Sequence, residues 1–451
     1  MEKVNVHKHV HFIGIGGISM SALAHILLVR GYKVTGSDGA DSSIIDVLRK
    51  DGAEIYIGQR AENISNPDLV VYTAAISNDN PELVAARDKG IKTMERADFL
   101  GMLMLEYEMP ISISGTHGKT TTTSMLSSVM LNANLDPTVL VGGEFNMIGG
   151  NYKIGSEKYL VFEGCEYVDS FLKFNPYSAI ILNIEEDHLD YFSGIDQIIS
   201  SFNKFMKKVP KHGFVVLNAD DQNVLKAAED VECKKITYGK SGDFSYDNIT
   251  YDENGCATFD VFYKGECLET ISLSVGGAHN VSNALAVFAA AYSLGVSPDV
   301  IAKGICAFTG TKRRFEYKGE INGAKIYDDY AHHPTEILAT HSIATNMQHN
   351  KTHIVFQPHT FSRTKALFSD FVSVLSKYDN VIITDIYAAR EKNTIGITAQ
   401  DLAAEIKNAR YISDFSEIAK QIKETVKPGD IVITMGAGTI TKLSDFILNV
   451  E

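Results

Sequence analysis

The residues Gly115-Thr116-His117-Gly118-Lys119-Thr120 have the types and spacing of a phosphate-binding loop. An apolar run precedes them and a stretch typical of a helix follows, so backbone N–H groups and the helix dipole should converge on one point that attracts phosphate. Within such a loop Lys119 reaches the terminal phosphates, and the Thr120 hydroxyl can ligate Mg²⁺. Ile113 stands where the common pattern has glycine, so the loop is a variant. The pattern, which runs on through Thr121, predicts nucleotide binding.

A second glycine-rich turn, Gly14-Ile15-Gly16-Gly17-Ile18-Ser19, lies between a predicted strand and a predicted helix, and Asp38 closes the next strand. Glycines in that position admit a diphosphate to the helix N-terminus, and the acid can hydrogen-bond a ribose hydroxyl. Ser19 replaces the third glycine of the usual fingerprint. The pattern therefore indicates a diphosphate ligand, with a purely structural turn as the alternative, and does not decide which nucleotide binds.

Acidic and histidine residues follow two predicted strands beyond the phosphate loop. Glu163 ends the run YLVF, and His188 closes the cluster Glu185-Glu186-Asp187-His188 after SAIILNI. Both strand ends should lie at the carboxyl edge of the sheet that carries the loop, where open α/β folds bind ligands. Oxygen and imidazole groups there could hold Mg²⁺. The spacing alone favours solvated loop residues over a metal site.

Two further polar clusters occur near the C-terminal end of the chain, each between a predicted strand and a predicted helix. They are Asp328-Asp329-Tyr330-Ala331-His332-His333-Pro334 and Gln357-Pro358-His359-Thr360-Phe361-Ser362-Arg363. Clusters at two strand ends favour a site over two surface loops, and an arginine there could clamp a carboxylate. Three histidines also alternate on the first predicted strand, but we expect no metal site from them: His7, His9 and His11.

The elements that must position these residues recur in three cycles. From residue 9 to 107, short apolar runs alternate with helical stretches, which is the rhythm of a parallel sheet with covering helices. A second cycle opens at ISISGTHGKT and contains a β-rich insert with the hairpin signal Asn254-Gly255. A third cycle runs to the end. We therefore predict an α/β protein of three domains: a Rossmann-like domain over 1–109, a central P-loop ATPase-type parallel sheet with the insert over 110–313, and a C-terminal Rossmann-like domain over 314–451.

The composition fits this class. The chain has 451 residues, 45% hydrophobic and 22% charged, as in ordinary globular proteins. Its net charge of -14 argues against a nucleic-acid surface, because binding a polyanion needs a basic stripe. The five cysteines form no CxxC pair, which fits reduced thiols, and no apolar run has the length of a signal or membrane segment. We expect a cytoplasmic protein with small-molecule substrates and no membrane partner; its oligomeric state stays open.

Together these motifs resemble those of the Mur ligase family, in order and over essentially the whole chain. The resemblance is carried by HFIGIGGISMSALA, GTHGKTTTT, FEGCEY, NIEEDHLDYF, AHNVSNALA, FTGTKRRFE, DDYAHHPTE, FQPHTFSRT and DIYAAREKNTIGI. It implies ligation with ATP and Mg²⁺ in peptidoglycan synthesis, in which the lactyl carboxylate of UDP-N-acetylmuramate becomes an acyl phosphate and is then joined to L-alanine. FQPHTFSRT and DIYAAREK separate the alanine-adding branch from ligases that add later residues.

The resemblance also implies residue roles that spacing cannot give. It identifies Glu163 and His188 as Mg²⁺ ligands, in addition to Thr120 from the loop pattern, which reverses the interpretation of Glu163 and His188 given above. The expected catalytic residues are Lys119, Glu163, His188, His332 and Arg363. The expected ATP-binding residues are Gly115, Thr116, His117, Gly118, Lys119, Thr120, Thr121, Asn280, Asn283 and Arg314. The UDP-sugar is expected at Gly14, Gly16, Gly17, Ile18, Ser19, Asp38 and Ser77, and the amino acid at Tyr330, His332 and Arg363.

Four positions depart from the family pattern. Relatives usually have alanine where Gly164 stands and often arginine near Val168. Thr360 replaces an arginine of many members, so recognition of the amino acid rests more heavily on Arg363. Asn203 stands where several later-acting relatives carry a carbamylated lysine, so we expect none.

Three other functions are alternatives. The nearest is a recycling ligase that joins a preformed peptide to the same sugar nucleotide. A P-loop kinase or ATPase would release ADP without an amino acid, and a nucleotide-sensing scaffold would bind ATP without turnover.

Overall fold

The structure is a computed structural model that describes residues 4, 8–73, 75–189, 191–389 and 391–450. The chain divides into two compact units, which we describe separately. The first comprises Met1–Thr123, Asn134–Ile184 and Asp196–Ile236, and the second comprises Ser124–Ala133, Glu185–Ile195 and Thr237–Glu451.

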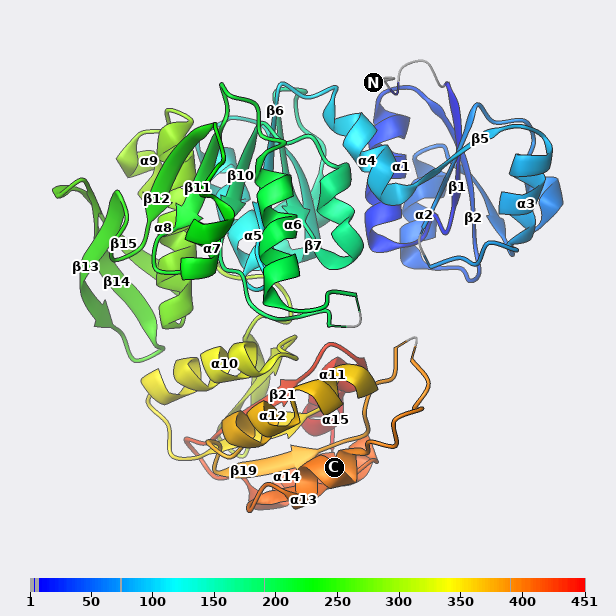
Figure 1. Cartoon of the computed structure of the whole chain (residues 1–451). Coiled ribbons are helices and arrows are strands. Elements are labelled where there is room, and N and C mark those ends of the chain that lie inside the picture. Colours follow the sequence, from blue (N-terminus) through cyan, green and yellow to red (C-terminus); the bar gives the residue numbers. More distant parts are fainter. Residues whose placement is uncertain (1–3, 5–7, 74, 190, 390, 451) are drawn as a thin grey trace. The chain divides into compact units, whose positions relative to one another are not determined.

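The N-terminal part of the first unit is a five-stranded parallel sheet in the order β3-β2-β1-β4-β5 (Figure 1). Its strands are β1 (His9–Ile13), β2 (Lys33–Asp38), β3 (Glu54–Ile57), β4 (Leu69–Tyr72) and β5 (Lys92–Glu95). Its helices are α1 (Ile18–Val29), α2 (Ser43–Lys50), α3 (Pro81–Asp88) and α4 (Arg96–Met104). The strand order reverses direction beside β1, which creates the crevice where such sheets bind ligands.

The second sheet is ten-stranded, in the order β15-β14-β13-β12-β11-β10-β6-β9-β7-β8, and its six strands from β11 to β8 are parallel except for β8. These six strands are β6 (Met109–Ser114), β7 (Thr138–Phe145), β8 (Gly150–Lys153), β9 (Tyr159–Gly164), β10 (Ser178–Ile181) and β11 (Phe214–Asn218). The accompanying elements are the short helix η4 (Tyr167–Lys173), α6 (Ile195–Met206) and α7 (Gln222–Ala227). All four residues of β10 are buried, as expected for a strand covered on both faces.

Helix α5 (Lys119–Asn132) starts at the phosphate loop, and strand β12 (Lys234–Tyr238) leads into the second unit. The predicted insert follows as three antiparallel strands, β13 (Phe244–Tyr251), β14 (Cys256–Tyr263) and β15 (Glu266–Gly276), with α8 (Ala278–Ser293) and α9 (Pro298–Cys306) behind them. Asn254-Gly255 lies in the turn between β13 and β14, so the hairpin prediction is confirmed.

The C-terminal sheet has the order β16-β17-β21-β18-β19-β20, parallel except for the edge strand β16. Its strands are β16 (Glu316–Ile321), β17 (Ala324–Asp329), β18 (Thr352–Phe356), β19 (Asn380–Ile383), β20 (Ala409–Tyr411) and β21 (Ile431–Met435). Its helices are α10 (Pro334–Asn346), α11 (Phe361–Ala366), α12 (Phe368–Leu375), α13 (Ala399–Ala404), α14 (Phe415–Thr425) and α15 (Leu443–Leu448).

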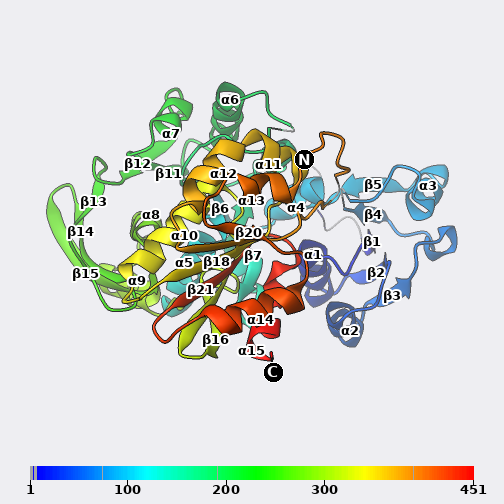
Figure 2. The ribbon, with the colours of Figure 1, turned by 90° about the horizontal axis from the view of Figure 1, so that it is seen from below.

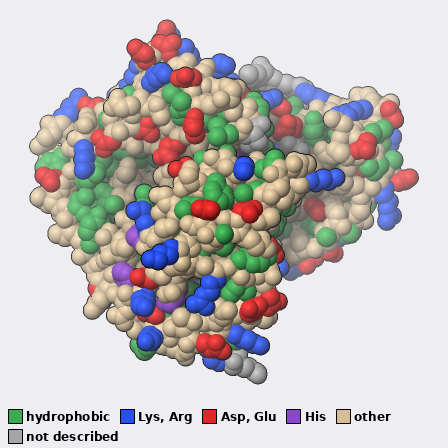
Figure 3. Space-filling model, turned by 60° about the horizontal axis from the view of Figure 1, so that its bottom comes forward, with side chains coloured by type: hydrophobic (Ala, Val, Ile, Leu, Met, Phe, Trp, Pro, Cys, Tyr) green, Lys and Arg blue, Asp and Glu red, His purple; other side chains and the backbone are tan. Residues whose placement is uncertain are grey.

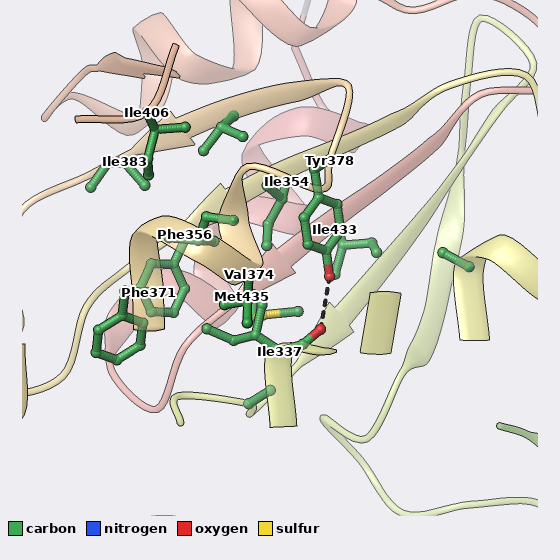
Figure 4. Close-up of a cluster of buried hydrophobic side chains, with 14 of the residues drawn as sticks. Ile337, Ile354, Phe356, Phe371, Val374, Tyr378, Ile383, Ile406, Ile433 and Met435 are labelled. Carbon is green, nitrogen blue, oxygen red and sulfur yellow. Dashed lines mark hydrogen bonds between the residues drawn. The ribbon is translucent and has the colours of Figure 1, made fainter. Parts of the chain in front are cut away.

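Two hydrophobic clusters cover the two faces of this sheet. Ile337 of α10, Phe371 of α12 and Leu402 of α13 belong to one cluster, and α14 and α15 contribute to the other. Figure 2 shows α10, α12 and α13 on one side of the sheet and α14 and α15 on the opposite side. In Figure 4 the Tyr378 hydroxyl donates to the Ile337 carbonyl at 3.1 Å, so a buried polar group is satisfied inside the first cluster.

The α/β class and the three-sheet organisation predicted from the sequence are confirmed. The exact domain boundaries stay predictions: β6 starts at Met109, one residue before the expected boundary, and the compact units number two. Among the described residues, every helix is too short or too polar to span a lipid bilayer.

Helix α4 makes a backbone approach that only glycine permits. A Cβ on Gly101 would lie 2.1 Å from the carbonyl oxygen of Lys173, and the Gly101 carbonyl accepts a hydrogen bond from the Asn175 side chain at 3.0 Å. Because both sides of this contact are backbone, neither can move aside easily. The contact fixes α4 against η4.

We predict that Gly101→Ala destabilises the protein by about 3 kcal/mol, because the added methyl group overpacks a backbone contact. Thermal unfolding followed by circular dichroism measures the effect. Gly150→Ala is the matched control, since nothing lies within 4 Å of a Cβ at Gly150. Equal melting temperatures of the two variants would contradict the interpretation.

Candidate active site

Hydrogen bonds with a residue that follows the neighbouring strand β10 hold the phosphate loop in its shape. Gly115 and Gly118 have φ of 145° and 84°, conformations that other residues rarely adopt. Asn183 follows β10 and accepts hydrogen bonds from Thr116 N through its carbonyl, at 3.1 Å, and from His117 N through its side chain, at 2.8 Å. Its amide group donates back to the His117 carbonyl at 3.1 Å. The loop is therefore shaped before any phosphate arrives.

Lys119, the first residue of α5, folds back over the loop. Its ammonium donates to the carbonyls of Gly115 and Thr116 at 2.5 and 3.0 Å and to both carboxylate oxygens of Glu166 at 3.2 and 3.0 Å. Burial alone would lower the lysine pKa, but the charge of Glu166 outweighs burial and the pKa is raised. Lys119 therefore stays charged at the point where phosphate is expected.

Two side chains with oxygen atoms, Glu163 and Thr120, lie beside the lysine. Glu163 is near the end of β9, directly opposite Ile113 of β6, and accepts a hydrogen bond from the Thr120 hydroxyl at 3.1 Å. Its second oxygen accepts from Gly142 N at 2.6 Å. The structure thus brings together Lys119, Thr120 and Glu163, and the hydroxyl and carboxylate pair is suited to a hard cation such as Mg²⁺. Thr121 continues α5.

The other glycine turn joins β1 to α1. Gly14 has φ of 82°, and the amides of Gly14 and Ile15 donate to the Ser37 carbonyl at 2.8 and 3.0 Å. Asp38, the last residue of β2, accepts from Gly16 N at 2.9 Å. The amide of Gly17 donates to the Gly14 carbonyl at 3.2 Å. The predicted turn and its acid therefore lie together at the carboxyl end of the sheet.

The remaining predicted residues of this turn lie nearby in the chain. Ile18 and Ser19 form the start of α1, and Ile18 is exposed. Ser77 follows β4, the neighbour of β1, and its hydroxyl donates to Asp79. Of the three histidines set aside above, His7 is outside the described residues, while His9 and His11 both contact the Thr35 hydroxyl, at 3.1 and 2.8 Å.

In the second unit, Arg363 forms a partly buried ion pair with Asp187. Its Nε and Nη2 groups donate to one oxygen of Asp187 at 3.2 and 2.9 Å, and its Nη1 group donates to the His359 carbonyl at 3.3 Å. Burial would raise the Asp187 pKa, but His188 and Arg363 hold that pKa well below its usual range. The carboxylate therefore remains ionised.

A pocket of about 160 Å³ opens beside this ion pair. Its walls combine the charged pair with apolar side chains, and the lining residues are Glu186, Asp187, His188, Leu189, Thr360, Ser362, Arg363, Ala366 and Leu367. The size and the two opposite charges suit a small zwitterion. Thr360, at the position of the expected departure, is one of the lining residues.

Tyr330 and His332 lie on the loop after β17. The His332 Nδ1 atom is 3.0 Å from the Tyr330 carbonyl, and the two rings meet edge to face at 5.4 Å. Burial lowers the His332 pKa, although Glu336 acts in the opposite direction, so the imidazole is neutral at neutral pH. Because a carbonyl can only accept, Nδ1 carries the proton and Nε2 presents a lone pair.

The residues expected near the adenine also belong to the second unit. Asn280 and Asn283 lie one turn apart on α8, where the Asn283 amide donates to the Asn280 side chain at 3.0 Å and Asn280 donates to the Gly276 carbonyl at 2.7 Å. Arg314 lies over the Tyr330 ring, 5.2 Å from its centroid. These contacts place Arg314 with the cluster after β17.

Sequence reasoning missed three partners of the predicted residues. Glu166 and Asp187 were inside recognised motifs but had no assigned role, and Asn183 was read only as part of a strand. A largely buried lysine or arginine needs a counter-charge, so acids in the recognised motifs were candidates, but no local spacing linked either acid to its cation. Figure 3 shows acidic and basic side chains intermixed over the face it presents, in keeping with small ligands.

Three family models match the chain in order. Residues 9–108 match the model described as Mur ligase family, catalytic domain; residues 113–291 match the Mur ligase middle domain; and residues 313–438 match the Mur ligase, glutamate ligase domain.

Similar proteins extend over nearly the full length. The UDP-N-acetylmuramate–L-alanine ligase of Acetivibrio thermocellus is 52% identical, covering 98% of this chain and 96% of the relative. The protein of the same name from Clostridium beijerinckii is 51% identical, covering 96% of each chain. Among solved structures, the UDP-N-acetylmuramate–alanine ligase of Thermotoga maritima has a TM-score of 0.82 at 30% identity, with 98% of each chain covered. A murein peptide ligase from Psychrobacter arcticus has a TM-score of 0.73 at 26% identity over 98% of each chain.

We predict that Glu166→Gln tightens the binding of ATP about tenfold, because the variant removes the carboxylate that competes with phosphate for Lys119. Titration with a fluorescent ATP analogue measures the dissociation constant. Glu157→Gln removes the same charge at an exposed position and serves as the control. Weaker binding by the Glu166 variant would show that the carboxylate organises the lysine instead of competing for it.

Proposed function

Because the chain belongs to the Mur ligase family, we propose that it joins L-alanine to the lactyl carboxylate of UDP-N-acetylmuramate with conversion of ATP to ADP and phosphate. The observation that carries the proposal is the presence in one chain of a preformed phosphate loop and a small pocket lined by Arg363 and Asp187. The names of relatives about half identical over nearly the full length support the same reaction.

The loop would bind ATP through the backbone N–H groups between Gly115 and Thr120. Lys119 would exchange its contact with Glu166 for the terminal phosphates, so the ammonium never lacks a counter-charge. Asn280, Asn283 and Arg314 remain the proposed adenine-side residues. Thr120 and Glu163 offer the oxygen atoms that Mg²⁺ prefers, and His188 remains a proposed ligand from the sequence. Mg²⁺ bound there would neutralise the charge of the phosphates.

The chemical problem is an unreactive carboxylate. In the proposed reaction the lactyl carboxylate attacks the γ-phosphorus of ATP, so that an acyl phosphate forms and ADP leaves. The amine of alanine then attacks the carbonyl carbon, and the tetrahedral intermediate expels phosphate to give the amide. The protein contributes position and charge neutralisation, and the steps require no nucleophile from the chain.

The second-unit pocket supports L-alanine as the amine. Arg363 would bind the amino acid carboxylate in a paired contact, and Asp187 would attract its ammonium group. Leu189, Ala366 and Leu367 leave an apolar wall for the methyl group. His332 would accept the proton of the ammonium at Nε2, since its lowered pKa keeps the ring neutral. Tyr330 fixes the ring through its carbonyl.

The glycine turn after β1 would hold the uridine diphosphate. Gly14, Gly16 and Gly17 admit the diphosphate to the start of α1, while Asp38 is placed to hydrogen-bond a ribose hydroxyl. Ile18, Ser19 and Ser77 complete the proposed surface. ATP and sugar nucleotides are cytoplasmic metabolites, so a cytoplasmic location is part of the proposal.

We predict ADP release only when UDP-N-acetylmuramate, MgATP and L-alanine are all present. A coupled assay with each component omitted in turn measures this dependence, and mass spectrometry identifies the amide. Lys119→Ala should lower turnover at least a thousandfold, because the γ-phosphate loses its principal cation.

The same assay separates the alternatives. ADP release without an amino acid would replace the ligase by an ATPase, and ATP binding without turnover would indicate a sensor. The likeness to the Psychrobacter arcticus ligase makes a preformed peptide the alternative amine. A tripeptide that reacts faster than L-alanine would overturn the alanine assignment.

A further inference from the structure

Arg96 places its positively charged guanidinium at the glycine turn of the first sheet. It is the first residue of α4 and follows β5 directly, so it lies at the carboxyl end of the sheet, as does the turn after β1. Its Nη1 group donates to the Ser19 hydroxyl in the first turn of α1 at 3.2 Å. No sequence motif included this arginine.

The position of Arg96 is fixed by the packing of α4. Phe99 of α4 meets Phe12 of β1 edge to face at 5.8 Å. Farther along the helix, Gly101 contacts the Lys173 backbone, and Asp98 pairs with the Lys173 ammonium at 2.8 Å. The guanidinium therefore projects from a helix that is anchored on two sides.

The guanidinium of Arg96 has fewer hydrogen-bond and ion-pair partners than a partly buried positive charge needs. It carries five N–H groups, yet within the described parts of the chain its only hydrogen bond is to Ser19, and no carboxylate lies within 4 Å. Burial lowers the Arg96 pKa, while the Cys165 thiol and Glu95 act in the opposite direction. A half-buried cation without an ion pair is unfavourable unless a ligand supplies the anion.

Four other partly buried arginines differ in this respect, whereas the exposed Arg60, Arg87 and Arg410 also have no carboxylate partner within the described residues. Arg30 pairs with Glu106, Arg49 with Asp41, Arg313 with Asp328 and Arg363 with Asp187. Arg96 is instead directed at a turn whose glycines and helix N-terminus are already suited to a diphosphate. Its charge complements that ligand.

We propose that Arg96 binds the diphosphate of the sugar nucleotide, with its guanidinium forming paired hydrogen bonds to phosphate oxygens beside Ser19. The assignment rests on the proposed function for the identity of the ligand and adds a binding residue to it. An arginine is suited to this role because its planar fork matches two phosphate oxygens and its charge persists when water is excluded.

Isothermal titration calorimetry with UDP and with UDP-N-acetylmuramate tests the assignment on the full chain without ATP. Arg96→Gln should weaken the binding of both ligands at least tenfold and to the same extent, because both carry the diphosphate. Arg96→Lys should weaken them less, since it keeps the charge but loses the fork. Glutamine is too short to reach Ser19 as Nη1 does, so the variant loses that hydrogen bond together with the charge, and circular dichroism checks that both variants are folded.

Arg49→Ala is the matched control: it removes an arginine whose partners are exposed carboxylates of the same sheet domain, and it should leave both affinities unchanged. Unchanged UDP affinity in Arg96→Gln would overturn the assignment, and so would a loss confined to UDP-N-acetylmuramate, which would place the arginine on the sugar or its carboxylate. If the unaltered protein fails to bind either ligand, the proposed function fails together with the assignment. If the wild type binds both ligands and Arg96→Gln binds them equally well, only the role assigned to Arg96 is rejected.

Discussion

A largely buried lysine that folds back over the predicted phosphate loop needs a counter-charge whether or not a nucleotide is present. Here Glu166 supplies it, with both carboxylate oxygens within 3.2 Å of the Lys119 ammonium. The arrangement keeps the lysine ionised and aimed at the loop. It also places an acid beside the proposed phosphate site, so an anion that binds Lys119 there would have to displace the contact with Glu166. The loop is therefore prepared for an anion because Lys119 can exchange Glu166 for it, and not because the site is an empty cavity.

The same rule organises the second unit. Arg363 and Asp187 are partly buried together, and the pair makes the pocket suitable for a molecule that itself carries both charges. A zwitterion can insert between the two groups without leaving either charge unpaired, whereas a neutral ligand of similar size would have to bury the pair intact or disrupt it. The ion pair of the unliganded protein thus restricts which ligands can take the place of the contact between Arg363 and Asp187.

Much of this fold could be predicted because buried parallel strands are continuous apolar runs. β10, β18 and β21 are such runs, and all of their residues are buried. Short edge strands gave weaker signals: β20 has three residues, too few for a periodic pattern. Loop glycines and the residues beside them were found from spacing. The pairs Lys119 with Glu166 and Arg363 with Asp187 were not, because each joins distant segments, the second across 176 residues. Without an alignment, tertiary pairing leaves no local pattern.

The close contact of Gly101 with the Lys173 backbone ties the edge of the first sheet to the segment that follows Glu163. Two backbones in direct contact resist sliding past each other, so this contact limits how far α4 and the segment after β9 can shift at that point. In the proposed reaction, a sugar nucleotide held near Ser19 would then have to carry its carboxylate on an arm long enough to reach the phosphate loop.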